Sequence, residues 1–153
     1  RSDEMGSAVH AASLERPVKL MIALEMIGYY DSTPGSQDYP SPAMSWLYPD
    51  RGDFIAVVGR MQDINAVRQL KAALLSSQDL SVYSMNAPGF IPGIDFSDHL
   101  NYWQHDIPAV MITDTAFYRN KQYHLPGDTA DRLNYQKMAQ VVDGVITLLY
   151  NSK

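Results

Sequence analysis

The segment Val18–Leu24 is almost continuously apolar and is followed directly by a carboxylate, Glu25. It is far shorter than the roughly 20 apolar residues that cross a bilayer. A short apolar run of this kind is typical of a strand that is buried on both faces of a largely parallel sheet. We therefore expect a buried strand over residues 18–24, with helices covering the sheet on either side.

The rest of the chain alternates strand-like and helix-like segments. Further strands are expected over Phe54–Val58, Leu80–Met85 and Ala109–Thr113, and helices over Met5–Leu14, Ile64–Leu75, Ser97 to about His105, and Asn134–Tyr150. The sequence shows no internal repeat and no low-complexity tract. Strands that alternate with helices predict an α/β fold, and a chain of 153 residues is expected to form part or all of one domain, 1–153.

Charge and composition exclude several classes of function. The 12 basic and 17 acidic residues give a net charge of −5 without runs of either sign, which offers nothing for a nucleic-acid backbone to bind. No apolar stretch is long enough for a membrane span, so we expect a soluble protein, although the sequence does not indicate its compartment. Because there is no cysteine, any metal must be held by His and carboxylate groups.

Polar residues just beyond strand ends are the first candidates for chemistry in an open α/β sheet. Glu25 meets this condition, because it closes the apolar strand. A carboxylate buried there must be paired, protonated or bound to a metal, since leaving it alone costs several kcal/mol. Pairing with a nearby Lys or Arg is the alternative to metal ligation.

A second candidate is Ser97-Asp98-His99, which follows a loop rich in Gly and Pro. Ser97 is a good helix N-cap, and Asp98 is interpreted either as a capping residue or as an acid near a metal or substrate. Neighbouring residues point to different helix faces, so Asp98 and His99 are not expected to form a catalytic dyad with each other.

The third candidate is the loop from Asp114 to Thr129, which concentrates His, Tyr, Asp and Arg after a strand. His124 is a metal-ligand candidate, Asp128 is placed to orient it, and Tyr123 has a hydroxyl that can donate to a developing oxyanion. A solvated loop with a hydrogen-bonded histidine is the alternative. His10 and His105 have no partner at ligand spacing and are interpreted as structural.

Four runs of the sequence together resemble one enzyme family. They are Met21–Tyr29 (MIALEMIGY), Pro92–His99 (PGIDFSDH), Asp114–Asn120 (DTAFYRN) and Tyr123–Thr129 (YHLPGDT). In this order they are similar to the zinc exopeptidases related to aminopeptidase S and glutaminyl cyclase. Each run is moderately specific, and together they span nearly the whole chain.

This resemblance implies a three-layer α/β/α fold with a mostly parallel mixed sheet, and removal of N-terminal residues from peptides by a metal-activated water. It implies two zinc ions bridged by one Asp in the complete enzyme. By position, Glu25 matches the carboxylate ligand after the strand and His124 the last histidine ligand. Tyr123 matches a tyrosine that polarises the scissile carbonyl.

The remaining matched positions lie around these three. The resemblance implies that Asp98, with His99 beside it, lies near the metals. It also implies that Arg119 and Asn120 shape the substrate pocket.

The departures from the family pattern concern the other half of the metal site. The His-x-Asp pair, which supplies a ligand and the bridging carboxylate, is absent, and so is the Glu-Glu pair that supplies the general base. Asp3-Glu4 lies too close to Met5 to be that pair. Two ligands are fewer than the three or four that zinc sites use, so the chain alone is expected to be inactive, with zinc absent or weakly bound.

These departures predict a C-terminal fragment whose missing N-terminal half is its partner. Because the chain begins with Arg1, we expect that its start was made by truncation or proteolysis. An exposed sheet edge would also favour a homo-oligomer in isolation. The alternatives are a glutaminyl cyclase-like acyl transferase, and a noncatalytic binding module that uses the loop Tyr29–Asp53 as its contact surface.

Overall fold

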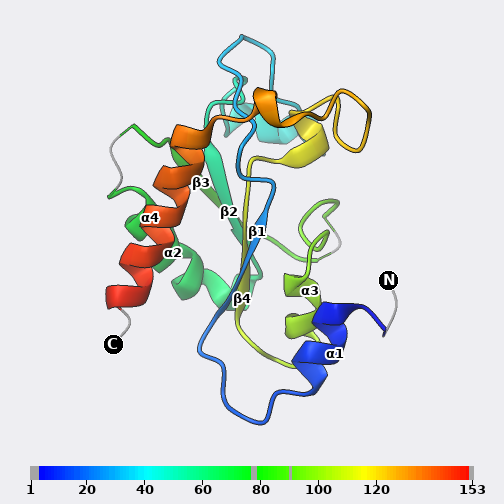
Figure 1. Ribbon diagram of the computed structural model, residues 1–153, viewed down its shortest axis with the longest axis vertical. Coiled ribbons are helices and arrows are strands. Elements are labelled where there is room, and N and C mark those ends of the chain that lie inside the picture. The colour runs from blue at the N-terminus through cyan, green and yellow to red at the C-terminus, as the bar shows by residue number, and fades with distance from the viewer. Residues whose placement is uncertain (1–3, 77–78, 90, 152–153) are drawn as a thin grey trace.

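The computed structural model describes residues 4–76, 79–89 and 91–151 (Figure 1). Its strands are β1 (Met21–Glu25), β2 (Ile55–Gly59), β3 (Val82–Asn86) and β4 (Ala109–Thr113). They form one sheet in the order β1-β4-β2-β3, in which β1 is parallel to β4, β2 is parallel to β3, and β2 is antiparallel to β4. The predicted mixed, mostly parallel sheet is confirmed.

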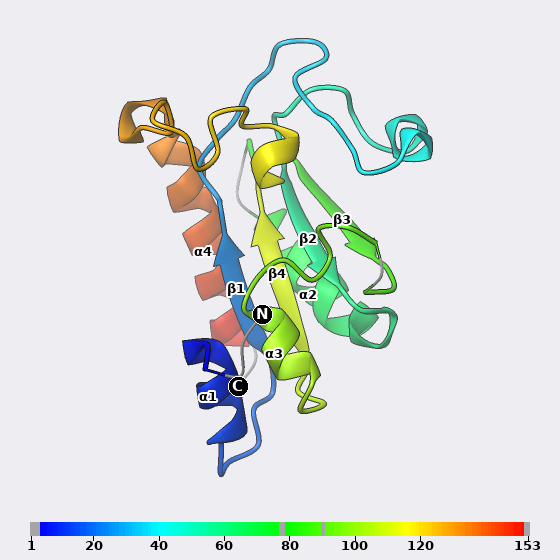
Figure 2. The same cartoon turned by 90° about the vertical axis from the view of Figure 1, so that its right-hand side faces the viewer.

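Helices cover both faces of this sheet, as the sequence pattern predicts. The α-helices are α1 (Gly6–Ala12), α2 (Ile64–Leu74), α3 (His99–Trp103) and α4 (Tyr135–Asn151), and short 3-10 helices span Pro42–Trp46, Met61–Asp63, Ala116–Tyr118 and Ala130–Arg132. Helices α2 and α4 pack together on one face, and α1 and α3 on the other (Figures 1 and 2). None of the helices within the described ranges is long and apolar enough to span a membrane.

Alternation along the strands divides the apolar side chains between two cores. On β2, Ile55 and Val57 face the core under α2 and α4, whereas Val58 faces the core under α1 and α3. The two helices of the first core approach closely at Gly144 of α4, where an added Cβ would lie 2.8 Å from the Cα of Leu74. A glycine at this position therefore sets the distance between α4 and α2.

Strand β1 departs from the expectation for residues 18–24. It begins at Met21, and only Ala23 is buried, while Leu24 is 50% exposed. The prediction that this strand is buried on both faces is wrong for the described structure, because β1 lies at an edge of the sheet. Its neighbour β4 is buried along its whole length.

The two parallel strands β1 and β4 end side by side, with Glu25 opposite Thr113. The loops that follow them cross the same end of the sheet, at the top of Figure 1. Left-handed backbone occurs directly after both strands, at Met26 (φ 55), Thr115 (φ 75) and Ala116 (φ 47). Such non-glycine conformations persist only where the surroundings hold them, and they cluster at functional sites.

Candidate active site

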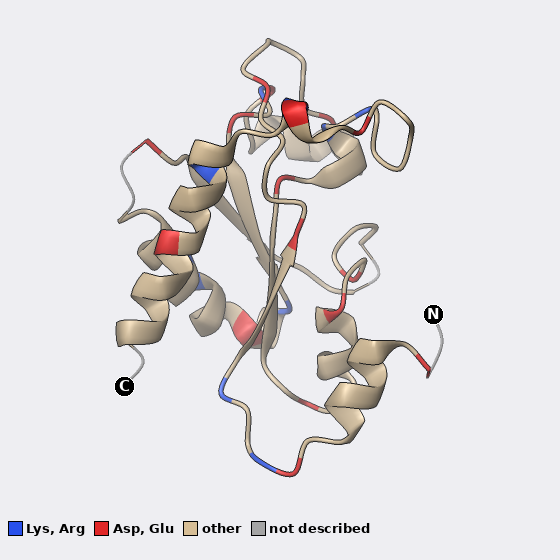
Figure 3. Ribbon diagram, in the orientation of Figure 1, with Lys and Arg blue, Asp and Glu red and all other residues tan. Residues whose placement is uncertain are grey.

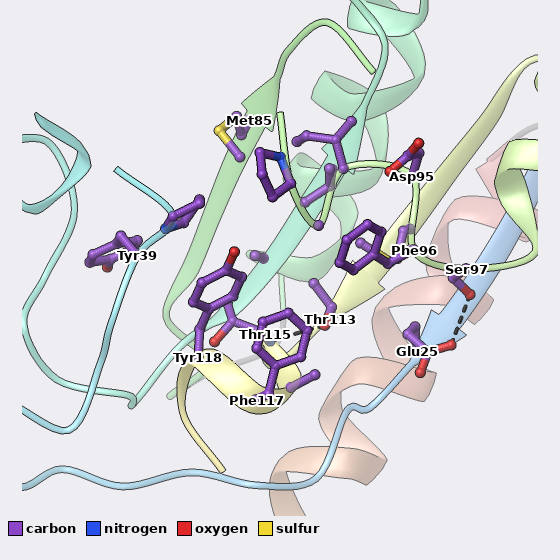
Figure 4. Close-up of a pocket in the computed structure, with 18 of the residues that line it drawn as sticks. Glu25, Tyr39, Met85, Asp95, Phe96, Ser97, Thr113, Thr115, Phe117 and Tyr118 are labelled. Atoms are coloured by element: carbon purple, nitrogen blue, oxygen red, sulfur yellow. Dashed lines mark hydrogen bonds between the residues drawn. The ribbon is translucent and has the colours of Figure 1, made fainter. Parts of the chain in front are cut away.

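A cavity of about 610 Å³ lies at this end of the sheet, on the face that carries α3. Its floor is formed by side chains of β2, β3 and β4, and its walls come from the loops around residues 37–48, 92–98 and 115–123. Figure 4 shows Glu25 and Ser97 at one end of the cavity and Tyr39 at the other. The cavity therefore joins the three segments that the sequence singles out.

Glu25 is half-buried and lines the cavity. Its Oε2 accepts a hydrogen bond of 2.8 Å from the Ser97 hydroxyl (Figure 4). Within the described ranges Glu25 forms no ion pair with Lys or Arg, which removes the simple pairing alternative there. The prediction that Ser97 caps a helix is wrong, because α3 begins at His99 and the Ser97 side chain turns to Glu25.

Asp98 and His99 have separate partners. Asp98 lines the cavity, and its Oδ1 accepts a 2.7 Å hydrogen bond from the Ser7 hydroxyl of the neighbouring helix. His99 is fully buried, and its Nε2 lies 2.6 Å from the carbonyl oxygen of Ile94. Burial lowers the pKa of His99, so the ring is neutral and donates through Nε2 to this carbonyl. His99 therefore supports the loop, while Asp98 faces the cavity.

Tyr123 lies with Glu25 on the cavity wall. Burial, followed by the charges of Glu25, Asp128 and Asp114, raises the pKa of Tyr123, so its hydroxyl stays protonated and can donate a hydrogen bond. The ring stacks on that of His124 with centroids 4.0 Å apart. His124 itself is exposed, has left-handed backbone (φ 59) and does not line the cavity.

Asp128 is exposed, and its Oδ1 accepts a hydrogen bond of 2.8 Å from Nδ2 of Asn120. In the part of the chain that the structure describes, no hydrogen bond joins Asp128 to His124, the residue it was expected to orient. Asn120 is buried, and its Oδ1 also accepts from Arg132. These contacts fix the loop that carries Tyr123 and His124.

Arg119 is 3% exposed and lies beside the cavity wall without lining it. Its guanidinium donates to Oε1 of Gln37 (2.9 Å) and to the carbonyl oxygens of Tyr29 (3.0 Å) and Phe54 (2.9 Å). Gln37 does line the cavity. The family resemblance associates Arg119 and Asn120 with the substrate pocket. In the structure they do not line the cavity, and their hydrogen bonds fix the loops that form its walls.

Asp114 is a residue to which the sequence analysis gave no role. It is 1% exposed; its Oδ2 accepts from the N–H groups of Gly28 (3.1 Å) and Tyr29 (2.8 Å), and its Oδ1 accepts from that of Ala116 (3.0 Å). Burial raises the pKa of Asp114 to about 6 despite these donors. Asp114 ties together the turns after β1 and β4. Its position directly after a buried strand, as for Glu25, was the signal that could have identified it.

Much of the cavity lining is apolar or aromatic. It includes Tyr48, Met85, Phe96, Phe117 and Tyr118. The hydroxyl of Tyr48 donates to the carbonyl oxygen of Ser84 (3.1 Å), and that of Tyr39 to the carbonyl oxygen of Pro49 (2.6 Å). Two hydroxyls of this wall are therefore already bonded to the protein, which suits an apolar ligand group.

The possible metal donors of the described residues lie apart from one another. Within residues 4–76, 79–89 and 91–151, no three His, Cys, Asp or Glu side chains converge closely enough to hold a metal ion. Glu25 and His124 remain two separate candidate donors, and Asp3 lies outside the described residues. These residues do not make a complete zinc site on their own.

Lys and Arg are scattered singly over the ribbon (Figure 3).

The sequence of this chain is similar to a known family of peptidases. The model of a protein family described as peptidase family M28 matches residues 5–149. The protein YfbL of Escherichia coli (strain K12) is 95% identical over all 153 residues of the chain, which span 47% of that relative. The chain thus spans about half the length of the curated relative that it matches.

Similar folds occur in solved aminopeptidase structures. LapA aminopeptidase of Legionella pneumophila superposes with a TM-score of 0.65 at 21% identity, over 94% of this chain and 34% of that one. The aminopeptidase of Aneurinibacillus sp. strain AM-1 gives 0.62 at 21% identity, over 95% and 29%. BSAP, a zinc aminopeptidase of Bacillus subtilis, gives 0.63 at 15% identity, over 97% and 32%. At these identities the likeness shows the fold.

Proposed function

This chain belongs to peptidase family M28, and from that premise we propose that it is the C-terminal part of a zinc aminopeptidase domain. The complete domain removes N-terminal residues from peptides. One observation supports this proposal above the others: Glu25 and Tyr123 line one cavity whose walls are largely apolar and aromatic. The acidic group is suited to metal ligation, the phenol can donate to a developing oxyanion, and the apolar lining can bury a side chain of the substrate.

We assign each of these groups a role toward the substrate. The Tyr123 hydroxyl, kept protonated by its raised pKa, donates to the carbonyl oxygen of the scissile bond as negative charge develops there. Glu25, oriented by Ser97, and His124 supply donors to the metal centre. Asp98 adds negative charge to the same cavity wall.

The apolar and aromatic part of the cavity is proposed to receive the side chain of the N-terminal residue. The hydroxyls of Tyr39 and Tyr48 donate to backbone carbonyls, and many of the other lining side chains are apolar or aromatic, so a charged side chain would lose water there at a cost. Large apolar residues such as Leu and Phe gain from burial at the same place. We therefore propose a preference for apolar N-terminal residues.

Two donors do not complete a zinc site, so the remaining ligands and the general base must come from another part of the polypeptide. The curated relative is about twice as long as this chain. Its matched segment is 95% identical to this chain. We propose that the missing N-terminal half supplies these groups. The chain alone is then inactive.

The decisive assay compares this chain alone with the complete E. coli relative carrying this chain in place of its matched segment. With zinc present, the complete protein should hydrolyse leucyl and phenylalanyl anilides, and more slowly glutamyl and lysyl anilides, whereas the chain alone should hydrolyse none. Glu25→Gln should abolish turnover, and Glu15→Gln, a change at an exposed carboxylate, should not. Hydrolysis by the isolated chain would refute the proposal.

The same proteins should be assayed for cyclisation of a peptide with N-terminal glutamine. Cyclisation without anilide hydrolysis would identify an acyl transferase related to glutaminyl cyclase. A complete protein with neither activity, but with retained peptide binding, would identify a binding module.

A further inference from the structure

Strand β2 carries one side chain that is open to the cavity. Within the described structure the other residues of β2 are buried, and Ala56 is partly exposed. Exposure of so small a side chain is unusual in a strand that is paired on both sides. Ala56 lines the cavity, so the cavity reaches down to the sheet itself at this position.

Larger side chains surround Ala56 on the cavity floor. Thr113 of β4 is in register with it on one side, and Tyr83 of β3 on the other. Phe54 and Val58, two residues before and after it, point to the same face of the sheet. All four of these neighbours line the cavity. The floor therefore has a depression over Ala56, where the smallest of these side chains stands.

Strand formation does not explain the choice of alanine at position 56. The neighbouring positions Ile55, Val57 and Val58 carry β-branched residues, which are enriched in strands, whereas alanine is depleted in strands. A β-branched residue at position 56 would therefore suit β2 at least as well. The small side chain has its effect on the cavity, because it leaves space there.

The aromatic side chains beside Ala56 are held in place. The rings of Phe54 and Tyr83 meet edge to face with centroids 5.1 Å apart, and those of Tyr48 and Tyr83 do so at 6.0 Å. The guanidinium of Arg119 lies over Phe54, with its Cζ 4.6 Å from the ring centroid. These contacts leave the aromatic wall little freedom to move aside. The depth of the cavity at this point is therefore set by residue 56.

A row of side chains leads from Glu25 to the depression. Glu25 is in register with Thr113, and Thr113 is in register with Ala56. Two strand spacings, about 10 Å, separate Glu25 from Ala56. Figure 4 shows the cavity in the same direction, from Glu25 across Thr113 towards Met85 on β3. An N-terminal residue held beside Glu25 would direct a long side chain over Thr113 and onto Ala56.

We infer that Ala56 determines how large an N-terminal side chain the site accepts. This inference rests on the proposed function and makes it more specific: the preferred peptides begin with a bulky apolar residue, such as Phe, Leu or Met, and not with Ala. A bulky side chain fills the depression and gains from burial there, whereas a small one leaves it unfilled. Ala56 contacts the substrate side chain and takes no part in bond cleavage.

Substitution tests this assignment in the complete relative carrying this chain. Ala56→Ile fills the depression, and because the larger side chain suits the strand, the Tm should not fall by more than about 2 °C. With zinc present, kcat/KM for phenylalanyl anilide should fall at least about 10-fold relative to that for alanyl anilide. Ala56→Val adds less volume and should lower the same ratio by a smaller factor.

Ala72→Ile is the matched control, because Ala72 is an exposed residue of α2, and it should leave the ratio unchanged. If Ala56→Ile lowers the Tm further than expected, Ala56→Val carries the test. An unchanged ratio in the folded variants of Ala56 would overturn the inference.

A binding measurement separates this inference from peptidase activity. Zinc is removed with EDTA, and the complete protein is titrated with L-phenylalaninol, an amino alcohol that has no bond to hydrolyse. The Kd measured by NMR should rise at least about 10-fold in Ala56→Ile and stay unchanged in Ala72→Ile. Equal affinity in all three proteins, or no binding by the unaltered protein, would count against the role of Ala56.

The two proposals can therefore fail separately. A complete protein that cleaves no anilide, but loses affinity for L-phenylalaninol through Ala56→Ile, would keep the role of Ala56 and reject the aminopeptidase. An active protein whose preference and affinity are unaffected by Ala56→Ile would keep the aminopeptidase and reject the role of Ala56.

Discussion

Two carboxylates at the ends of β1 and β4, half-buried Glu25 and buried Asp114, organise the site at the scale of single residues. Glu25 faces the cavity and accepts from Ser97, whereas Asp114 faces the protein and accepts three backbone N–H groups. The sequence analysis identified Glu25 by its position directly after an apolar strand, whereas it gave no role to Asp114, which occupies the same kind of position. It could not separate their roles, because the direction of each side chain depends on loops that are distant in the chain.

Asp114 should make stability depend on pH. Its pKa is about 6 in the folded protein, above the ordinary 3.8, so the folded state binds the proton more tightly. The stabilisation from protonation is therefore complete below about 3.8 and is lost as the pH rises through about 6. Urea denaturation should show the wild-type chain gaining about 1 kcal/mol relative to Asp114→Asn between pH 7 and pH 5. A difference that does not change with pH would contradict this assignment.

Ser97 should act through Glu25. Removing its hydroxyl in Ser97→Ala leaves the carboxylate free to rotate, so zinc binding by the complete protein should weaken about 10-fold. Titration calorimetry with zinc measures this directly. Ser13→Ala removes an exposed hydroxyl that bonds only to a carbonyl of its own helix, and it should leave the affinity unchanged. An unaltered affinity for Ser97→Ala would show that Glu25 is not a ligand or is held by other contacts.

At the scale of helices and strands, periodicity predicted most of the fold. The strand expected over 109–113 and the helix expected over 134–150 are observed as Ala109–Thr113 and Tyr135–Asn151. The sequence did not reveal that β2 runs antiparallel to β4, nor that Ser97 contacts Glu25, since both depend on segments that meet only after folding. Strand β1 was predicted to be buried on both faces because nearly all its residues are apolar. In the described structure it lies at the edge of the sheet, and only Ala23 is buried.

The contact between α2 and α4 should be intolerant of any side chain at Gly144. Gly144→Ala places a Cβ 2.8 Å from the Cα of Leu74, so the helices must separate. We expect a loss of about 1–3 kcal/mol in the free energy of unfolding, although alanine favours helix. Gly6→Ala meets no atom within 4 Å and should stabilise slightly. Chemical denaturation of both variants tests the comparison, and a neutral Gly144→Ala would show that the contact is looser than described.

At the scale of the whole molecule, the chain has two apolar cores and an exposed apolar side. The two cores are well formed, yet β1 and α4 leave Leu24, Ile146 and Leu149 exposed. The family could be predicted from motifs, because each lies in one short segment. The shape of the cavity could not be predicted, because its walls come from loops that are distant in the sequence.

We expect the isolated chain to associate with itself. Within the described structure the outer edge of β1 is unpaired, and Leu24, Ile146 and Leu149 are exposed apolar side chains on β1 and α4. Both features favour contact between copies. Light scattering over a range of micromolar concentrations should show a mass that rises above that of the monomer, and Ile146→Asp should reduce this rise. A monomer at every concentration would contradict the prediction.

The hydrogen bond from Ser97 to Glu25 joins residues that are 72 positions apart. The entropic cost of closing a loop increases with its length. Contacts among β2, α2 and β3 close shorter loops and therefore carry a smaller cost. During refolding, the β2–α2–β3 unit should therefore gain amide protection first, and the acidic end of the cavity should take its final shape late. A newly made molecule would be compact before its cavity is complete.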